Sequence, residues 1–133
     1  MYARRSCQYN GFDNTLPENA QSVIFKSMSE YRVVITTCPD QSTADDLAAY
    51  LVDHGLAACV NVIPGMRSYY QWKGEVCNDA EFVLLIKTRT VLYPRLEESI
   101  VERHPYELPE VIALPIESGL DGYLRWVDEQ TGK

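Results

Sequence analysis

The 133-residue sequence lacks the features that mark several large classes of protein. No stretch approaches the roughly 20 apolar residues that a membrane-spanning helix needs. The segment from Cys7 to Lys26 is polar and has no apolar core of the kind found in secretory signals. Basic residues are scarce, since 12 Lys and Arg stand against 19 Asp and Glu, a net charge of −7. This balance argues against nucleic-acid and anionic-membrane partners, so we expect a cytoplasmic protein without either partner.

Motifs that identify common metal and enzyme sites are missing as well. The four cysteines, Cys7, Cys38, Cys59 and Cys77, form no CxxC pair, which excludes a zinc ribbon and a thioredoxin-type motif. A chain of this length builds its own core, so we expect free thiols rather than disulfides. GxSxG, HExxH, P-loop and GxGxxG motifs do not occur. We expect a protein that is not an enzyme, and an enzyme of unfamiliar design is the outside alternative.

Residues 1–29 differ in composition from the rest of the chain. They are rich in Asn, Ser, Gln and Tyr, and their only apolar cluster runs from Val23 to Phe25. A readable alternation of strands and helices begins at Glu30. We therefore predict an N-terminal extension over residues 1–29 and one compact domain over residues 30–133, in keeping with roughly 100–200 residues for a single domain.

Apolar periodicity and turn formers predict a mixed order of strands and helices. Short β-branched or apolar runs indicate strands, at residues 31–37, 56–63, 66–73, 82–88 and 111–116. Apolar residues at helical spacing indicate helices, at residues 43–54, 91–104 and 119–129. Pro64-Gly65 indicates a turn, and Gly74 lies where a hairpin turns. The order predicts an α+β fold of the ferredoxin-like, split βαβ type with a long β-hairpin and a C-terminal helix.

The predicted strands are apolar on both of their sides. In a ferredoxin-like subunit the two helices cover one face of the sheet and leave the other face bare. A lone subunit would expose a broad apolar face to water, which soluble monomers rarely do. We therefore predict an oligomer in which another copy of the chain covers that face.

The densest run of chemically useful residues is RHPYELPE, from Arg103 to Glu110. It lies at a predicted helix-to-strand junction, where a rigid scaffold often positions functional loops. His104 can bind a borderline or soft metal ion, and Glu107, Glu110 or Glu117 can supply oxygen ligands nearby. A stiff connector, whose two prolines fix its path, explains the same residues equally well, so both interpretations stay open.

Three further positions place reactive or binding groups where a ligand can reach them. Cys38 ends the first strand, where its thiolate and His104 would form a soft site for copper(I) or zinc. Lys87 interrupts the apolar strand FVLLIKT and needs a carboxylate partner, a pocket or an anion. The aromatic arm from Tyr69 to Trp72 fits either stacking on a ligand or packing against another subunit.

Several short segments together resemble the CutA family of divalent-cation-tolerance proteins. They follow one order along the chain: Pro39-Asp40, LAACVN at 56–61, IPG at 63–65, YYQWKG at 69–74, IKT at 86–88, HPYELPE at 104–110 and YLRW at 123–126. Together they extend from about Tyr31 to Val127, nearly the whole predicted domain, and residues 1–29 lie outside them.

The resemblance implies a ferredoxin-like subunit in a tight homotrimer, similar in architecture to PII-type signalling proteins, with the hairpin at residues 64–80 reaching between subunits. It also implies tolerance of divalent metals, chiefly copper, and no catalytic activity. Copper-binding members use a Cys on the first strand and two adjacent His before the Pro-Tyr pair. Here Thr36 holds the first position, Cys38 follows two residues later, and Arg103-His104 replaces the histidine pair.

These observations favour a homotrimeric metal-ion-response or small-ligand-sensing protein with a site in a cleft between subunits. We predict six site residues, of which four bind a ligand and two bind a metal: Lys87, Tyr106, Glu117 and Trp72, and then His104 and Cys38. The candidate ion is copper or another divalent metal. The alternative is a structural module, a trimer whose surface anchors another protein.

Overall fold

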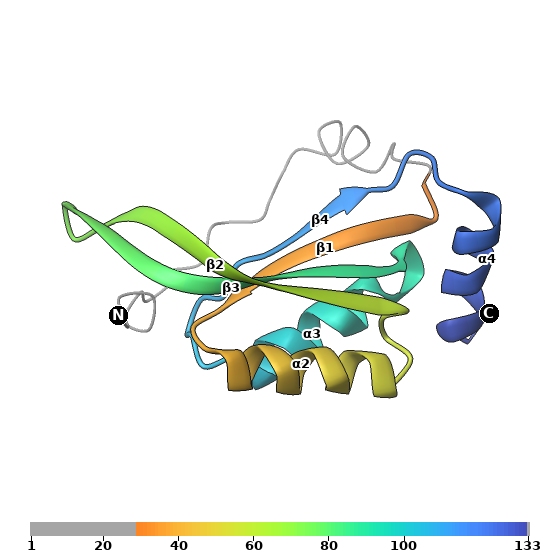
Figure 1. The fold of residues 1–133 in the computed structure, drawn as a ribbon, viewed down its shortest axis with the longest axis horizontal. Helices are drawn as coiled ribbons and strands as arrows, with labels where there is room; N and C mark the ends of the chain where they lie inside the picture. The colour runs from red at the N-terminus through yellow and green to blue at the C-terminus, as the bar shows by residue number, and fades with distance from the viewer. Residues whose placement is uncertain (1–28, 133) are drawn as a thin grey trace, which may run out of the picture.

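The computed structural model describes residues 29–132 and has a four-stranded antiparallel sheet at its centre (Figure 1). The strands are β1 (Tyr31–Cys38), β2 (Cys59–Trp72), β3 (Glu75–Arg89) and β4 (Val111–Pro115). The helices are α2 (Gln41–Asp53), α3 (Tyr93–Arg103) and α4 (Asp121–Gln130), and the short 3₁₀-helix η2 (Thr90–Leu92) leads into α3. Apart from Ser29, the predicted N-terminal extension lies outside the described residues.

The sheet has the strand order β2-β3-β1-β4, which is that of a split βαβ unit. The central strand β1 pairs with β3 on one side and with β4 on the other, so that Ile35 lies between Leu85 and Ile112. The predicted α+β fold with a long hairpin and a C-terminal helix is confirmed. No helix within residues 29–132 is long and apolar enough to cross a membrane.

The hairpin differs from the prediction at Pro64-Gly65. The predicted turn there is wrong, because β2 continues through both residues and only shifts its register against β3. Gly65 has a φ of +81°, which glycine adopts without strain, so this dipeptide forms a bulge that bends the strand. The chain turns instead at Lys73-Gly74, where both φ angles are positive, at 49° and 80°. Two positive φ angles in succession are typical of a type I′ hairpin turn.

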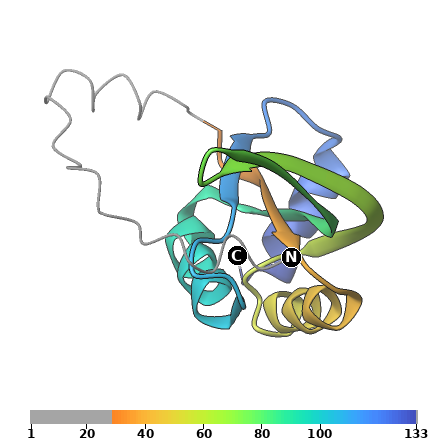
Figure 2. The same cartoon turned by 90° about the vertical axis from the view of Figure 1, so that its left-hand side faces the viewer.

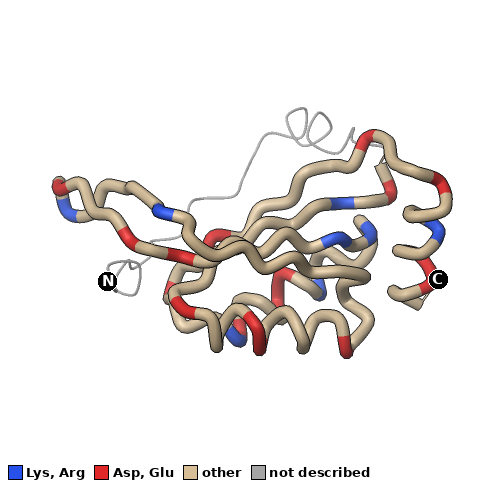
Figure 3. The backbone as a smooth tube through the Cα atoms, viewed as in Figure 1, with Lys and Arg blue, Asp and Glu red and all other residues tan. Residues whose placement is uncertain are grey.

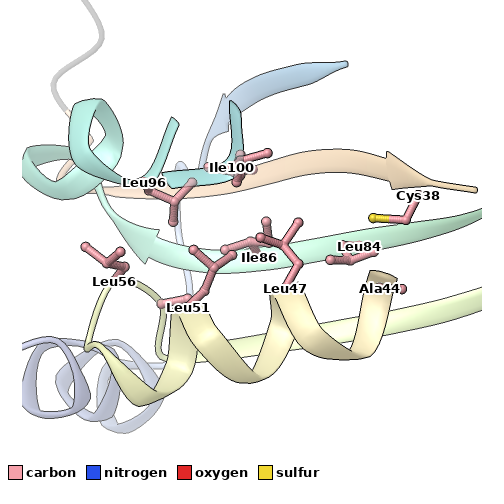
Figure 4. Packing of buried hydrophobic residues seen from close by; sticks show 11 residues of the cluster. Cys38, Ala44, Leu47, Leu51, Leu56, Leu84, Ile86, Leu96 and Ile100 are labelled. Carbon is pink, nitrogen blue, oxygen red and sulfur yellow. The ribbon is translucent and has the colours of Figure 1, made fainter. Parts of the chain in front are cut away.

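Helices α2 and α3 form a layer against one face of the sheet (Figure 2). The N-terminus of α2 is capped by Asp40, whose Oδ1 accepts the N–H of Thr43 at 2.8 Å. Between this layer and the sheet lies the core (Figure 4), made of Val34, Cys38, Ala44, Leu47, Leu51, Leu56, Ala57, Leu84, Ile86, Leu96 and Ile100. Each fully buried Leu or Ile side chain stabilises the fold by about 1.5–3 kcal/mol.

Within residues 29–132, no such layer covers the opposite face of the sheet, which we call the open face. Its side chains come from alternate positions of the same strands, and most are apolar. Ile63 is 42% exposed, and Ile112 and Leu114 are each 49% exposed. The prediction of strands that are apolar on both sides is therefore confirmed. Helix α4 lies at one end of the sheet and buries Val127 (Figure 1).

Candidate functional site

The predicted site residues fall into two groups at opposite ends of the sheet. Cys38 and His104 lie at the C-terminal end of β1, since His104 bonds to Thr37. Lys87 lies near the other end of β1, where it pairs with Val33. The four steps along the strand from Val33 to Thr37 span about 13 Å. One chain therefore does not bring the six predicted residues into one site.

Glu117 belongs to the second group and is exposed. It directly follows Ile116, whose N–H donates to the carbonyl of Tyr31 at the start of β1. Its carboxylate is therefore placed far along the sheet from His104, and the predicted supply of an oxygen ligand to His104 by Glu117 is wrong for a single chain. A cleft that joins the two groups needs residues of a second copy.

His104 is buried, and both of its ring nitrogens are hydrogen-bonded within the chain. Nε2 lies 2.6 Å from the carbonyl oxygen of Thr37, and Nδ1 lies 3.1 Å from the backbone nitrogen of Tyr106. Because a carbonyl only accepts and a backbone N–H only donates, the ring is neutral and carries its proton on Nε2. A metal ion at His104 must displace one of these two bonds.

Tyr106 extends the His104 interactions toward the hairpin. Its phenol donates to Oε2 of Glu81 at 3.1 Å, and both side chains are buried, with Glu81 only 2% exposed. The bonds from Thr37 through His104 and Tyr106 to Glu81 thus join β1, the α3–β4 loop and the base of the hairpin. This network favours the connector interpretation of the 103–110 segment.

Cys38 is fully buried in the core beside Ala44 and Leu84 (Figure 4). Burial raises the pKa of its thiol from 9.0 to about 12, and the charges of Asp40 and Glu81 add to this effect. The thiol is thus protonated at neutral pH, whereas a metal ligand must be a thiolate. Thr36 lies on the same side of β1 and is also fully buried. Neither side chain reaches the surface.

Arg103 has a role that the sequence analysis missed. Its guanidinium lies over the ring of Tyr50, with Cζ 3.3 Å from the ring centroid. The ring of His54 also stacks on Tyr50, with a centroid separation of 3.9 Å. The spacing of Tyr50 and His54, four residues apart on α2, is the sequence signal for the second contact. Arg103 therefore stabilises the packing of α3 on α2 through a cation–π contact.

The described part of the chain offers no ready metal centre. Among residues 29–132, no group of three or more His, Cys, Asp or Glu side chains is placed to hold an ion. Cys38, Cys59 and Cys77 are free thiols, as the sequence predicts. Acidic and basic residues are interspersed along the described chain rather than gathered in one basic patch (Figure 3).

Trp72 lines a cavity of about 450 Å³ between the hairpin and the start of β4. The other lining residues are Tyr70, Gln71, Leu108, Pro109, Glu110, Val111 and Ile112. The walls are mainly aromatic and aliphatic, so the cavity fits an apolar group of a small molecule or of another subunit. Tyr69, the first residue of the aromatic arm, is exposed and does not line it.

Lys87 is half-buried on the open face, and its ammonium bonds to the side-chain oxygen of Asn61. The carbonyl oxygen of Leu85 lies 3.5 Å from the same nitrogen. Among residues 29–132, no carboxylate lies within 4.0 Å of this ammonium group. The prediction that Lys87 needs a carboxylate or an anion therefore stays a prediction, which the assembled protein can test.

Comparison with known families gives one match that covers most of the chain. Residues 32–130 match the family described as CutA1 divalent ion tolerance protein. The Thermus thermophilus protein named divalent-cation tolerance protein CutA is 48% identical over 100 residues, which cover 75% of this chain and 97% of that protein. Human protein CutA is 46% identical over 95 residues, 71% of this chain and 53% of that protein. The chain thus spans about half the length of its mammalian relatives.

Solved structures resemble the chain over the same region. The divalent cation tolerance protein Cut A1 of Thermus thermophilus has a TM-score of 0.75 at 47% identity, covering 77% of this chain and 99% of that one. CutA1 of Oryza sativa has a TM-score of 0.77 at 43% identity, covering 79% and 96%. These structures share the arrangement of sheet and helices described above.

Proposed function

The chain belongs to the CutA1 divalent ion tolerance family, and from that premise we propose that it acts as a homotrimer that binds a divalent ion at a cleft between subunits. As a member of this family it is a non-enzymatic divalent-cation tolerance protein. The trimer, the cleft and the bound ion are the proposal, and copper is the first candidate ion.

The open face of the sheet is the observation that carries the proposal. Ile112 and Leu114 are each 49% exposed on a face whose other side chains are mostly apolar. Covering such a face with a second copy removes apolar surface from water, at about 25 cal/mol for each Å². A monomeric subunit would leave this apolar face exposed to water.

Two strand edges support the same assembly. Within residues 29–132, β4 has a strand partner only on its β1 side. The hairpin beyond Phe82, the last residue of β3 that pairs with β1, has no third strand beside it either. Unpaired edges present rows of free N–H and C=O groups that another strand can satisfy. The hairpin of one copy therefore fits against β4 of the next.

The donor set of residues 29–132 does not fit a divalent ion. The Cys38 thiol is buried and protonated, and both nitrogens of His104 are used. An ion in the proposed cleft therefore needs ligands from a neighbouring copy, with His104 exchanging its bond to Thr37 for the metal. The cost of breaking that bond predicts weak rather than tight binding.

Light scattering on the full-length protein tests the assembly, and calorimetric titration with copper and zinc tests the site. We expect three chains per particle and about one ion per subunit, with weaker binding in His104→Ala. His54→Ala is the matched control, because it removes the other, exposed histidine. A monomer contradicts the trimer, and the absence of heat with both metals contradicts ion binding.

The cavity beside Trp72 favours a second candidate function, that of a small-ligand sensor. Its volume of about 450 Å³ and its aromatic walls fit a small apolar or aromatic molecule. Fluorescence of Trp72 in a Trp126→Phe background tests this function with a panel of aromatic carboxylates. A saturable change supports a sensor, and an unchanged spectrum with the whole panel contradicts it.

The cytoplasm stays the compartment that we propose for the chain. Relatives from Arabidopsis thaliana and Archaeoglobus fulgidus are named chloroplastic and periplasmic, respectively. Fractionation of cells that express the full-length chain at its natural level tests the proposal, and recovery of the chain in another compartment contradicts it.

A further inference from the structure

A cluster of hydrogen-bond donors lies on the open face, at the end of the sheet next to α4. Cys59 and Lys87 are direct partners across β2 and β3. Asn61 lies two residues further along β2 and therefore on the same face. Tyr123 reaches the cluster from α4, where its phenol lies near the Cys59 thiol. The four side chains come from three elements that are far apart in the sequence.

The cluster carries one positive charge and no negative charge. The ammonium of Lys87 donates to the side-chain oxygen of Asn61. Because that oxygen accepts, the amide nitrogen of Asn61 keeps two N–H groups for another partner. No carboxylate within residues 29–132 lies within 4.0 Å of the ammonium. The cluster is therefore rich in donors and short of acceptors.

Tyr123 adds a donor that stays protonated at neutral pH. Burial raises the pKa of its phenol above the ordinary value of 10.0, and Cys59 raises it further. Its neutral O–H can donate to an acceptor near Lys87. Tyr123 is 39% exposed, so the side chain is not enclosed by the chain's own residues.

The surroundings of Lys87 explain why it needs an acceptor. Lys87 on β3 pairs with Val33 on β1, and Val33 in turn pairs with Leu114 on β4. When a second copy covers these apolar side chains, the ammonium loses water and its charge becomes costly unless an anion pairs with it. The same loss of water strengthens the attraction between the ammonium and that anion.

We propose that Lys87, Asn61, Tyr123 and Cys59 form a binding site for one oxyanion group, a carboxylate or a phosphate. Two oxygens of such a group match the ammonium of Lys87 and the amide N–H of Asn61. The inference rests on the trimer proposed above, because the covered face is what makes the anion necessary. The group comes either from a free small molecule or from an Asp or Glu side chain of the neighbouring copy.

Thermal unfolding of the full-length protein tests the site, with inorganic phosphate as the probe. Midpoints are compared in potassium phosphate and in potassium chloride at equal ionic strength, and light scattering follows assembly in parallel. The variants are Lys87→Met, which removes the charge, and Lys87→Arg, which keeps it. Arg67→Met is the control, because it removes an exposed cation from the hairpin.

Two results support the site and separate the sources of the anion. If the anion is free, phosphate raises the midpoint of the wild type and of Arg67→Met, and Lys87→Met loses at least tenfold in phosphate affinity while it stays assembled. If the anion belongs to the neighbouring copy, phosphate has no effect, and Lys87→Met dissociates whereas Lys87→Arg and Arg67→Met do not.

One result contradicts the anion site and leaves the proposed function unaffected. In that case the wild type is a trimer, and Lys87→Met matches Arg67→Met in assembly and in its midpoint in both salts. A monomeric wild type contradicts the proposed trimer instead. The open face then stays uncovered, and the anion site, which rests on the trimer, is contradicted together with it.

Discussion

The two faces of the sheet are built from the same strands and differ in what covers them. Val34, Leu84 and Ile86 point toward the helices and are fully buried. Ile112 and Leu114 point toward the open face, and each is 49% exposed. Both sets are aliphatic, so composition does not separate them. What separates them is that, within residues 29–132, helices cover one face only. Apolar strands on the other face therefore predict a partner.

The largest expected effect comes from a charge placed in the open face. We expect Leu114→Lys to convert the proposed trimer to monomers, a threefold fall in mass by light scattering, because a buried unpaired ammonium opposes assembly. Val101→Lys is the matched control, since Val101 is equally exposed, at 49%, but lies on α3. An assembled Leu114→Lys would show that this face is free in solution.

A cavity on the helix side of the sheet is expected to have a smaller effect than the loss of assembly. Leu84→Ala should lower the free energy of unfolding by about 2–5 kcal/mol, because Leu84 is fully buried among close-packed side chains. Urea denaturation of each variant at one protein concentration measures this loss. Leu108→Ala, a truncation of an exposed leucine outside the sheet, is the control. A loss below about 1 kcal/mol for Leu84→Ala would contradict close packing on the helix side.

A third expected effect lies at the base of the hairpin, where polar groups are buried. Tyr106→Phe removes the hydroxyl that donates to Glu81. We expect a loss of about 1–3 kcal/mol in the free energy of unfolding, because a buried carboxylate loses a donor. Tyr69→Phe removes the hydroxyl of an exposed tyrosine and should change nothing measurable. Equal stability of the two variants would mean that the buried bond contributes little.

The smallest expected effect is a pH dependence of the free energy of unfolding, which comes from Cys38 on the helix side of the sheet. The folded chain holds the thiol of Cys38 protonated to about pH 12, whereas the unfolded thiol ionises near its ordinary pKa of 9.0. The folded state thus binds the extra proton between these values, so stability falls as pH rises above 9. The expected loss is about 1 kcal/mol between pH 9 and 10.

Urea denaturation of the wild type and of Cys38→Val across pH 8–10 measures this dependence. The wild type should lose free energy of unfolding relative to Cys38→Val as pH rises. Cys77→Val, which alters a thiol on the hairpin, should keep the wild-type slope. A slope that is unchanged in Cys38→Val would mean that the thiol does not titrate with unfolding.

Local pattern was sufficient to predict the elements and the two apolar faces. Alternation in strands and helical spacing depend on neighbouring residues, and both appear in the sequence. Pro64-Gly65 was misjudged because a bulge and a turn need the same positive φ from glycine. Only pairing with β3, which is remote in the sequence, separates the two cases.

The site was harder to predict because its contacts are long-range. His104 makes a hydrogen bond with Thr37, which lies 67 residues away in the sequence. No local sequence pattern indicates such a partner. The presence of a cation in an apolar strand singles out Lys87, and its role as a site residue stays a prediction. The donors around it became visible only with the register, since Cys59 and Asn61 lie on another strand and Tyr123 on a helix.

The length of the hairpin has a consequence for the lifetime of the proposed trimer. Among the residues that the structure describes, the two arms beyond Phe82 pair only with each other, so each arm offers a long free edge. A subunit that leaves the assembly must release all the backbone bonds along such an edge before it gains any in return. Departure is therefore slow, and differently labelled trimers mixed after purification should exchange subunits far more slowly than chains that are made together in one cell.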